Sequence, residues 1–206
     1  IALNASISVL LVDTSLIKTS SIRLISPTMN IAIGAKIDLN GRGYTEGTGT
    51  SVGKAKTDVT WTGCCSDYYE AYSGAGGAYG GDGGKSCKKE SYVNKMPDGG
   101  DAYGSATWPD DYGSGGGKAY YGRSGKANTG GAGGGRIYIT LTGSMLLDGV
   151  ISADGDNGEY YDGSGSYDQS GGGGAGGSIL IEADSLSGNG MIRANGGGVW
   201  NNLGGG

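Results

Sequence analysis

The stretch SGGGGAGGSILIEADSLSGNGMIRANGG, residues 170–197, places ten glycines around two strand-like segments, SILIEA and MIRA. Its Gly172-x-Gly174-x-x-Gly177 run fits the dinucleotide-binding fingerprint, but that motif follows a strand and opens a helix whose N-terminus holds the pyrophosphate. Here a strand pattern follows the glycines, and no helical pattern is present. The stretch therefore indicates a structural use of glycine rather than a cofactor cradle.

The end of this stretch belongs to a repeat. AKIDLNG (35–41), GVISADG (149–155) and GMIRANG (190–196) share the form small-x-Ile-x-(Leu/Ala)-(Asn/Asp)-Gly. In a strand, the Ile and the residue two places later lie on one face, and the residue between them, Asp38, Ser152 or Arg193, lies on the other. The closing Asn/Asp-Gly pair is strong turn chemistry.

Another strand-like segment precedes each copy: SIRLI from Ser21, RIYITL from Arg136 and SILIEA from Ser178. The predicted unit is a glycine run, a strand, a short link, a strand and a turn, and the last two copies lie about 41 residues apart. A period of this size built on short strands is typical of solenoids. We expect an all-β fold, a right-handed parallel β-helix or related β-solenoid with long glycine-rich, polyglycine-like loops.

Composition supports one unusual domain. The chain has 206 residues, of which 48 are glycine and three are proline, with no Phe and no His. Collagen would need strict Gly-X-Y and abundant proline, whereas glycine here can serve close backbone approach. The net charge of −5 carries no basic block, so nucleic acid is not an expected partner. No apolar run is long enough for a transmembrane helix.

The chain also resembles a family of glycine-rich, β-helix-like extracellular proteins of eukaryotes. The stretches that carry the resemblance are IDLNGRGYTEGTGTSVG (37–53), SGAGGAYGGDGG (73–84), AYGSATWPDDYGSGGG (102–117), GGAGGGRIYI (130–139) and SGGGGAGGSILI (170–181). The resemblance covers nearly the whole chain after about Ser21 and implies a secreted or surface-exposed fold. It supplies no catalytic residues. We expect an N-terminal arm at 1–20 and a single domain at 21–206, with residues 54–128 unreadable by periodicity.

Sequence motifs do not favour catalysis. Gly49-Thr-Ser51-Val-Gly53 fits a nucleophile elbow, but the chain has no histidine to activate the serine. Carboxylates could still support polysaccharide cleavage or bind Ca²⁺, and a solvated acidic loop is the third interpretation. We expect no enzyme activity and no cofactor other than a weakly indicated Ca²⁺. The acidic candidates are Asp154, Asp156, Glu159 and Asp162, with Asp168 and the Asp110-Asp111 pair.

Cysteine usage bears on location. Cys87 could form a disulfide with Cys64 or with Cys65, which would indicate an oxidising, extracellular setting; buried reduced thiols are the alternative. Asn4 begins the only N-glycosylation sequon, Asn4-Ala5-Ser6. We expect the protein outside the cell or on its surface.

The N-terminal arm alternates in polarity and predicts one long strand with an apolar face. An unpaired strand edge can pair with another chain, so we expect strand addition to a neighbouring copy. The alternative is that the arm pairs within the chain with residues 16–25 as the first coil. The residues of the apolar face are Ile1, Leu3, Ala5, Ile7, Val9 and Leu11.

The predicted function is structural, as a protomer of an extracellular filament, appendage or surface matrix that assembles with copies of itself. The alternative is an adhesin module that binds glycans, with Trp61, Trp108 and Trp200 as contact residues. A polysaccharide-cleaving β-helix enzyme is the third interpretation.

Overall fold

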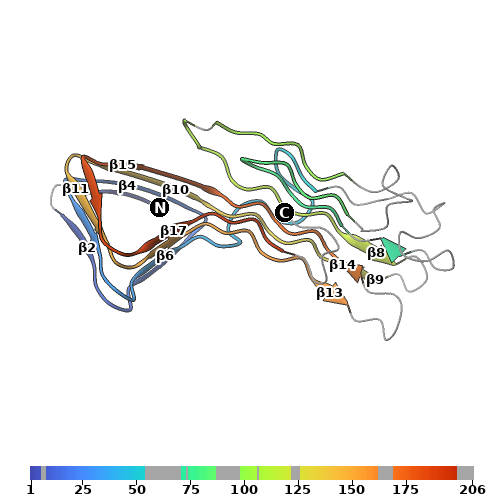
Figure 1. Cartoon of the computed structure of the whole chain (residues 1–206). Helices are drawn as coiled ribbons and strands as arrows, with labels where there is room; N and C mark the ends of the chain where they lie inside the picture. The colour runs from blue at the N-terminus through green and yellow to red at the C-terminus, as the bar shows by residue number, and fades with distance from the viewer. Residues whose placement is uncertain are drawn as a thin grey trace.

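A computed structural model describes residues 1–5, 8–53, 71–72, 74–86, 98–105, 107–121, 126–161 and 169–198. The regular secondary structure within these ranges consists of β-strands alone, which confirms the predicted all-β class. Three parallel sheets of four strands each lie at one end of an elongated molecule, and glycine-rich segments extend from them to the other end (Figure 1).

The chain visits the three sheets in the same order four times, and each visit is called a rung here. Sheet A contains β1 (Ala2–Asn4), β4 (Ser21–Ser26), β10 (Arg136–Leu141) and β15 (Ser178–Glu182). Sheet B contains β2 (Val9–Leu11), β5 (Met29–Ile31), β11 (Ser144–Leu147) and β16 (Ser185–Ser187). Sheet C contains β3 (Leu16–Lys18), β6 (Lys36–Asp38), β12 (Val150–Ser152) and β17 (Met191–Arg193).

The core lies between the three sheets and is built from columns of apolar side chains that continue from rung to rung. In rungs 2 and 3 these side chains are almost fully buried, as Ile37 and Ile151 are at 0% exposure. One such column from each sheet is followed here, and the three are called the sheet A, B and C columns. From rung 1 to rung 4 they are Leu3–Leu24–Ile139–Ile181, Val9–Met29–Met145–Leu186 and Ile17–Ile37–Ile151–Ile192.

The predicted repeat is confirmed in register. Ile37, Ile151 and Ile192 are direct parallel partners in sheet C, and the preceding strands β4, β10 and β15 pair in sheet A. The short link predicted between the two strands of each unit contains the sheet B strand, which the sequence pattern did not indicate. At three or four residues, such as Met29–Ile31, these strands are too short to show a period.

The N-terminal arm does not form one long strand. Its described residues make β1 in sheet A, β2 in sheet B and β3 in sheet C, which pair in parallel with β4, β5 and β6 of the same chain. The first-coil alternative is therefore confirmed in part: β1 pairs with Arg23–Ile25, inside the predicted range 16–25, whereas β2 pairs with Met29–Ile31 beyond it. The apolar face of the arm packs on rung 2. Leu3 lies opposite Leu24, and Leu11 opposite Ile31. Ile7 lies outside the described residues.

The glycine-rich segments all leave the sheets at the same corner, between sheet C and sheet A. Residues 39–135 connect β6 to β10, and residues 153–177 connect β12 to β15. Their regular elements are short antiparallel strands near the far end (Figure 1). These are β7 (Ala71–Tyr72), β8 (Ala119–Tyr121), β9 (Lys126–Asn128), β13 (Tyr160–Tyr161) and β14 (Gln169–Ser170).

Between the sheets and these short strands, the segments 74–78, 113–117, 131–135, 153–158 and 171–177 lie side by side and are called the glycine bundle. Their backbone hydrogen bonds repeat every three residues. Gly171, Gly174 and Gly177 donate to the carbonyls of Glu159, Asp156 and Ala153 of one neighbour, and Gly172 and Ala175 donate to Gly117 and Ser114 of another. A three-residue period is that of the polyproline II helix and not that of a β-ladder.

Glycine is required in the bundle because backbones approach too closely for a side chain. A Cβ atom on Gly172 would lie 1.9 Å from the Ala75 carbonyl oxygen, and one on Gly133 would lie 1.8 Å from the Gly113 carbonyl oxygen. Gly172 and its neighbours therefore serve backbone packing, and the fingerprint-like spacing of Gly172, Gly174 and Gly177 has this structural explanation.

Candidate functional site

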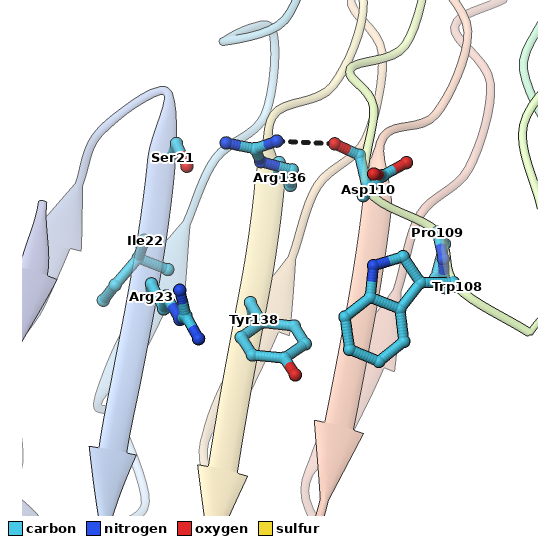
Figure 2. A pocket seen from close by; sticks show the side chains of 8 residues that line it. All are labelled: Ser21, Ile22, Arg23, Trp108, Pro109, Asp110, Arg136 and Tyr138. Atoms are coloured by element: carbon cyan, nitrogen blue, oxygen red, sulfur yellow. Dashed lines mark hydrogen bonds between the residues drawn. The ribbon is translucent and has the colours of Figure 1, made fainter.

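A pocket of about 190 Å³ lies on the outer face of sheet A, where residues 107–112 cross over β10 and β15. One wall comes from β4 and β10, and the other comes from the crossing segment (Figure 2). Residues with alternate positions on a strand share a face, so the strands present Arg23 and Tyr138 side by side as direct register partners. The lining residues are Ser21, Ile22, Arg23, Trp108, Pro109, Asp110, Arg136 and Tyr138.

The pocket combines two aromatic rings with two guanidinium groups. The rings of Trp108 and Tyr138 have centroids 5.5 Å apart and an interplanar angle of 58°. The Arg23 guanidinium carbon lies 5.3 Å from the Tyr138 ring centroid, within cation–π range. Arg136 is 5.2 Å from the Tyr112 ring and donates from Nη1 to the Asp110 carbonyl oxygen at 2.6 Å (Figure 2).

Asp111 holds the crossing segment in place through hydrogen bonds to residues distant in the sequence. Its carboxylate accepts hydrogen bonds from the Tyr44 hydroxyl at 3.2 Å, from the Thr50 hydroxyl at 3.0 Å and from the backbone N–H of Tyr112 at 2.8 Å. Its carbonyl oxygen accepts from the Ser178 hydroxyl on β15 at 2.7 Å. The Asp110-Asp111 pair proposed as an acidic candidate therefore has one member committed to holding the segment that carries Trp108.

Two tyrosines beneath this segment are held neutral over a wide pH range. Burial raises the pKa of Tyr103 to about 12, and the Asp111 charge adds to the effect, although the hydrogen bond with Ser114 opposes it. The Tyr103 hydroxyl donates to the Tyr112 carbonyl oxygen at 2.5 Å and lies 2.8 Å from the Ser114 hydroxyl. Burial also raises the pKa of Tyr44, followed by the charge of Asp111. These groups support the segment and do not face the pocket.

Of the three tryptophans predicted to contact glycans, Trp108 lies in the pocket with 49% of its surface exposed. Trp61 and Trp200 lie outside the described residues, as do Cys64, Cys65 and Cys87. Asn4 is exposed on β1, so its side chain is accessible at the surface. The role of each of these residues stays a prediction.

The acidic candidates are dispersed among separate contacts. Asp154 pairs with Arg193 at 2.9 Å and accepts from the Asn195 N–H. Glu159 accepts from the Thr129 N–H at 3.1 Å, and hydrogen bonding by Thr129 lowers the pKa of its carboxyl. Across the described ranges, no three His, Cys, Asp or Glu residues are grouped closely enough to hold a metal ion. Asp156 is exposed, and Asp162 and Asp168 lie outside the described residues.

Sequence reasoning found Trp108 but missed Arg23, Arg136 and Tyr138. All three occupy outward positions of strands that the sequence did predict, since Ile22, Ile137 and Ile139 take the inward ones. Reading the outward positions of SIRLI and RIYITL as a surface would have given the two arginines. Their convergence with Trp108 depends on how residues 107–112 cross the sheet, which no local pattern encodes.

Comparison with protein-family models, with curated proteins and with solved structures found no match to this chain. The resemblance to glycine-rich surface proteins therefore stays a prediction. No helix long and apolar enough to cross a membrane occurs in the described part of the chain.

Proposed function

We propose that this chain is a structural protein, a four-rung β-solenoid with polyglycine II-like loops that stacks end to end as the protomer of an extracellular filament, appendage or surface matrix. The repeated order of sheets A, B and C supports the solenoid, and the three-residue hydrogen-bond period of the glycine bundle supports the polyglycine II-like loops.

The observation that carries the proposal is that the same apolar columns are open at both terminal rungs. Leu186 is 55% exposed and Ile192 is 41% exposed in rung 4, whereas their column partners Met145 and Ile151 in rung 3 are at 0%. In rung 1, Leu3 is 46% exposed, and Val9 and Ile17 are half-buried. A hollow of about 560 Å³ also lies between Ile179 and Ile192 of rung 4 and the segment from Gly77 to Asp82.

A second copy fits these open faces because the columns are chemically alike at both ends. If rung 1 of one copy follows rung 4 of another in the register seen within the chain, Ile181 meets Leu3, Leu186 meets Val9 and Ile192 meets Ile17. The open strand edges would continue the three parallel sheets by the same backbone pairing. A head-to-tail contact of this kind does not close on itself and produces a filament.

An outward-facing column of sheet C would bring two positive charges together when copies stack, so assembly should depend on salt concentration. Lys18, Asp38, Ser152 and Arg193 are successive register partners in sheet C, so Arg193 would lie near Lys18 of the next copy. Each cation already has a carboxylate partner within its own chain, Arg193 with Asp154 and Lys18 with Asp38. Salt screens the remaining repulsion, so we expect assembly to strengthen as NaCl rises.

Ile192→Asp tests the proposal, because it places a charge in the rung 4 face where water can still reach it. Leu146→Asp is the matched control, since Leu146 is 39% exposed but lies on the outward side of β11 in rung 3. Electron microscopy and sedimentation velocity of the full chain should show filaments for the wild type and for Leu146→Asp. Ile192→Asp should be monomeric and should shorten wild-type filaments when mixed, because its rung 1 can still add to a growing end.

The proposal fails if the wild type stays monomeric at high protein and salt concentrations. It also fails if Leu146→Asp abolishes assembly as completely as Ile192→Asp, since the end faces would then not be the contact.

A second candidate function, a glycan-binding module, is favoured by the sheet A pocket. Its Trp108 and Tyr138 rings offer apolar faces of the kind that pack against sugar rings, with polar groups at the rim. Trp108→Ala should abolish binding on a glycan array while circular dichroism stays unchanged. Binding that survives this substitution would exclude the pocket as the site.

A further inference from the structure

We propose that the sheet A pocket binds an acidic saccharide, with a sugar ring against Trp108 and its carboxylate or sulfate on Arg23 and Arg136. The inference deepens the second candidate function and rests on it, and it is independent of end-to-end assembly. The pocket is small for a drug-sized ligand and has room for about one sugar residue.

The first support is that neither arginine of the pocket has a carboxylate partner among the described residues. The ion pairs among the described residues use Lys18, Lys85, Lys118 and Arg193 as their cations. In a chain with 20 acidic and 15 basic residues, a cation has many potential partners. Two guanidinium groups beside one pocket therefore leave donors available for an anion from outside the chain.

The second support is that the groups are already held in place. Arg23 lies over the Tyr138 ring, and the Tyr138 hydroxyl donates to Glu182 at 3.2 Å. Arg136 is fixed by the Asp110 carbonyl oxygen and still has donors that this bond does not use. The backbone N–H of Trp108 donates to the Ser105 hydroxyl at 3.1 Å. Preorganisation of this kind lowers the entropic cost of binding.

The third support is the charge around the pocket, which favours one anionic group over a dense polyanion. The Asp110 carboxylate lies at the pocket rim, and Glu182 lies beyond the Tyr138 hydroxyl. These acids repel a second negative group close to the first. An acidic sugar with a single carboxylate or sulfate therefore fits better than a nucleic acid backbone, which needs a continuous basic surface.

Calorimetric titration of the full chain tests the inference with three probes. These are the methyl glycoside of galacturonic acid, its methyl ester and the methyl glycoside of galactose carrying one sulfate, so that each anionic probe has one sugar ring and one negative group. We expect an anionic probe to bind about tenfold or more tightly than the ester, which corresponds to one charge-assisted contact. Preference for the uronate would identify carboxylate as the anion, and preference for the sulfated sugar would identify sulfate.

Variants separate the arginine contact from general electrostatics. Arg23→Gln should weaken the acidic probe about tenfold while leaving the ester unchanged, and Arg23→Lys should restore part of the loss. Arg42→Gln removes an exposed arginine outside the pocket lining and should change nothing. Trp108→Ala should weaken the acid and the ester together, because it removes the ring contact.

Equal binding of acid and ester would overturn the inference while leaving glycan binding intact. A complete lack of binding by all three probes would also overturn the inference, whereas the glycan array decides separately whether the pocket binds other sugars. An equal loss of binding in Arg42→Gln and Arg23→Gln would show that the probe is attracted by the overall charge and not by this pocket. None of these outcomes bears on filament formation, which Ile192→Asp tests separately.

Discussion

The three parallel sheets, called the sheet stack here, and the glycine bundle fill their interiors in opposite ways. In the stack, side chains such as Leu24 and Ile139 fill the interior, and the backbones of adjacent strands pair in regular parallel ladders. In the bundle, the buried side chains are no larger than those of Ala and Ser, as at Ala75 and Ser114, and each segment bonds through its backbone to several neighbours. The sheet stack is stabilised by the apolar side chains that it buries, whereas the bundle can pack only because its glycines have no side chain.

The difference has an energetic basis. Apolar burial stabilises a fold at about 25 cal/mol per Å², and glycine contributes little of this while losing more backbone entropy than any other residue. The bundle must therefore be stabilised by hydrogen bonds made in several directions and by its anchorage to the sheets at both ends of each excursion. The two regions should respond to opposite kinds of substitution.

Truncation of a buried side chain in the sheet stack should lower the free energy of unfolding the most. Ile139 is at 0% exposure and lies between Leu24 and Ile181 in the sheet A column. Ile139→Ala should lower the free energy of unfolding by roughly 2–5 kcal/mol, because it removes buried methylenes and leaves a cavity. Ile33→Ala is the control, since Ile33 is 76% exposed. Denaturant unfolding measures both, and similar losses would contradict a side-chain-built core.

Addition of a methyl group in the glycine bundle should give the next largest loss of folding stability. A Cβ on Gly172 would meet the carbonyl oxygen of Ala75 at 1.9 Å and its carbonyl carbon at 2.3 Å, and both atoms belong to rigid backbone. Gly172→Ala should therefore destabilise the protein by about 1–3 kcal/mol through overpacking, although it adds only one methyl group.

Gly80→Ala is the matched control for this addition, because a Cβ at Gly80 would meet no atom within 4 Å. Its effect should stay within about 0.5 kcal/mol. Thermal unfolding of both variants decides the point. If Gly172→Ala is as well tolerated as Gly80→Ala, the bundle is looser than its hydrogen bonds indicate.

The same difference explains how much the sequence could predict. Apolar alternation and the Asn/Asp-Gly turn located the strands around Ile37, Ile151 and Ile192 and their mutual register, since each position carries a side-chain signal. In the bundle one glycine is like the next, so the composition predicted close backbone packing but could not say that Gly172 contacts Ala75. Within residues 54–128, which periodicity did not resolve, the glycine runs at 74–84 and 113–117 are of this kind.

The pocket falls between these two cases. Trp108 stood out as a residue type, and the outward positions of Arg23 and Arg136 follow from strands that were predicted. Their meeting depends on the bonds of Asp111 to Tyr44 and Ser178, which join segments far apart in the chain. A tertiary contact of this kind has no signature in local sequence.

Substitution of Tyr103 should give the smallest loss of folding stability, because it removes only one hydrogen-bonded hydroxyl group. Tyr103 is one of the few large side chains that contact the bundle. Its hydroxyl is bonded to the Tyr112 carbonyl oxygen and to the Ser114 hydroxyl, and its pKa is raised to about 12 against an ordinary value of 10.0. A raised folded-state pKa contributes stability that is complete below pH 10 and is lost as pH rises through about 12. Tyr103→Phe removes both the hydrogen bond and this ionisation.

At pH 8 we therefore expect Tyr103→Phe to be less stable than the wild type by about 1 kcal/mol, the worth of an ordinary buried hydrogen bond. Between pH 10 and 12 the wild type should lose this advantage, because ionising Tyr103 becomes easier in the unfolded chain than in the folded one. Urea unfolding at pH 8 and pH 11 measures the gap. A gap that is as wide at pH 11 as at pH 8 would mean that the hydroxyl is solvated, and the side-chain contribution to the bundle would then be negligible at this position.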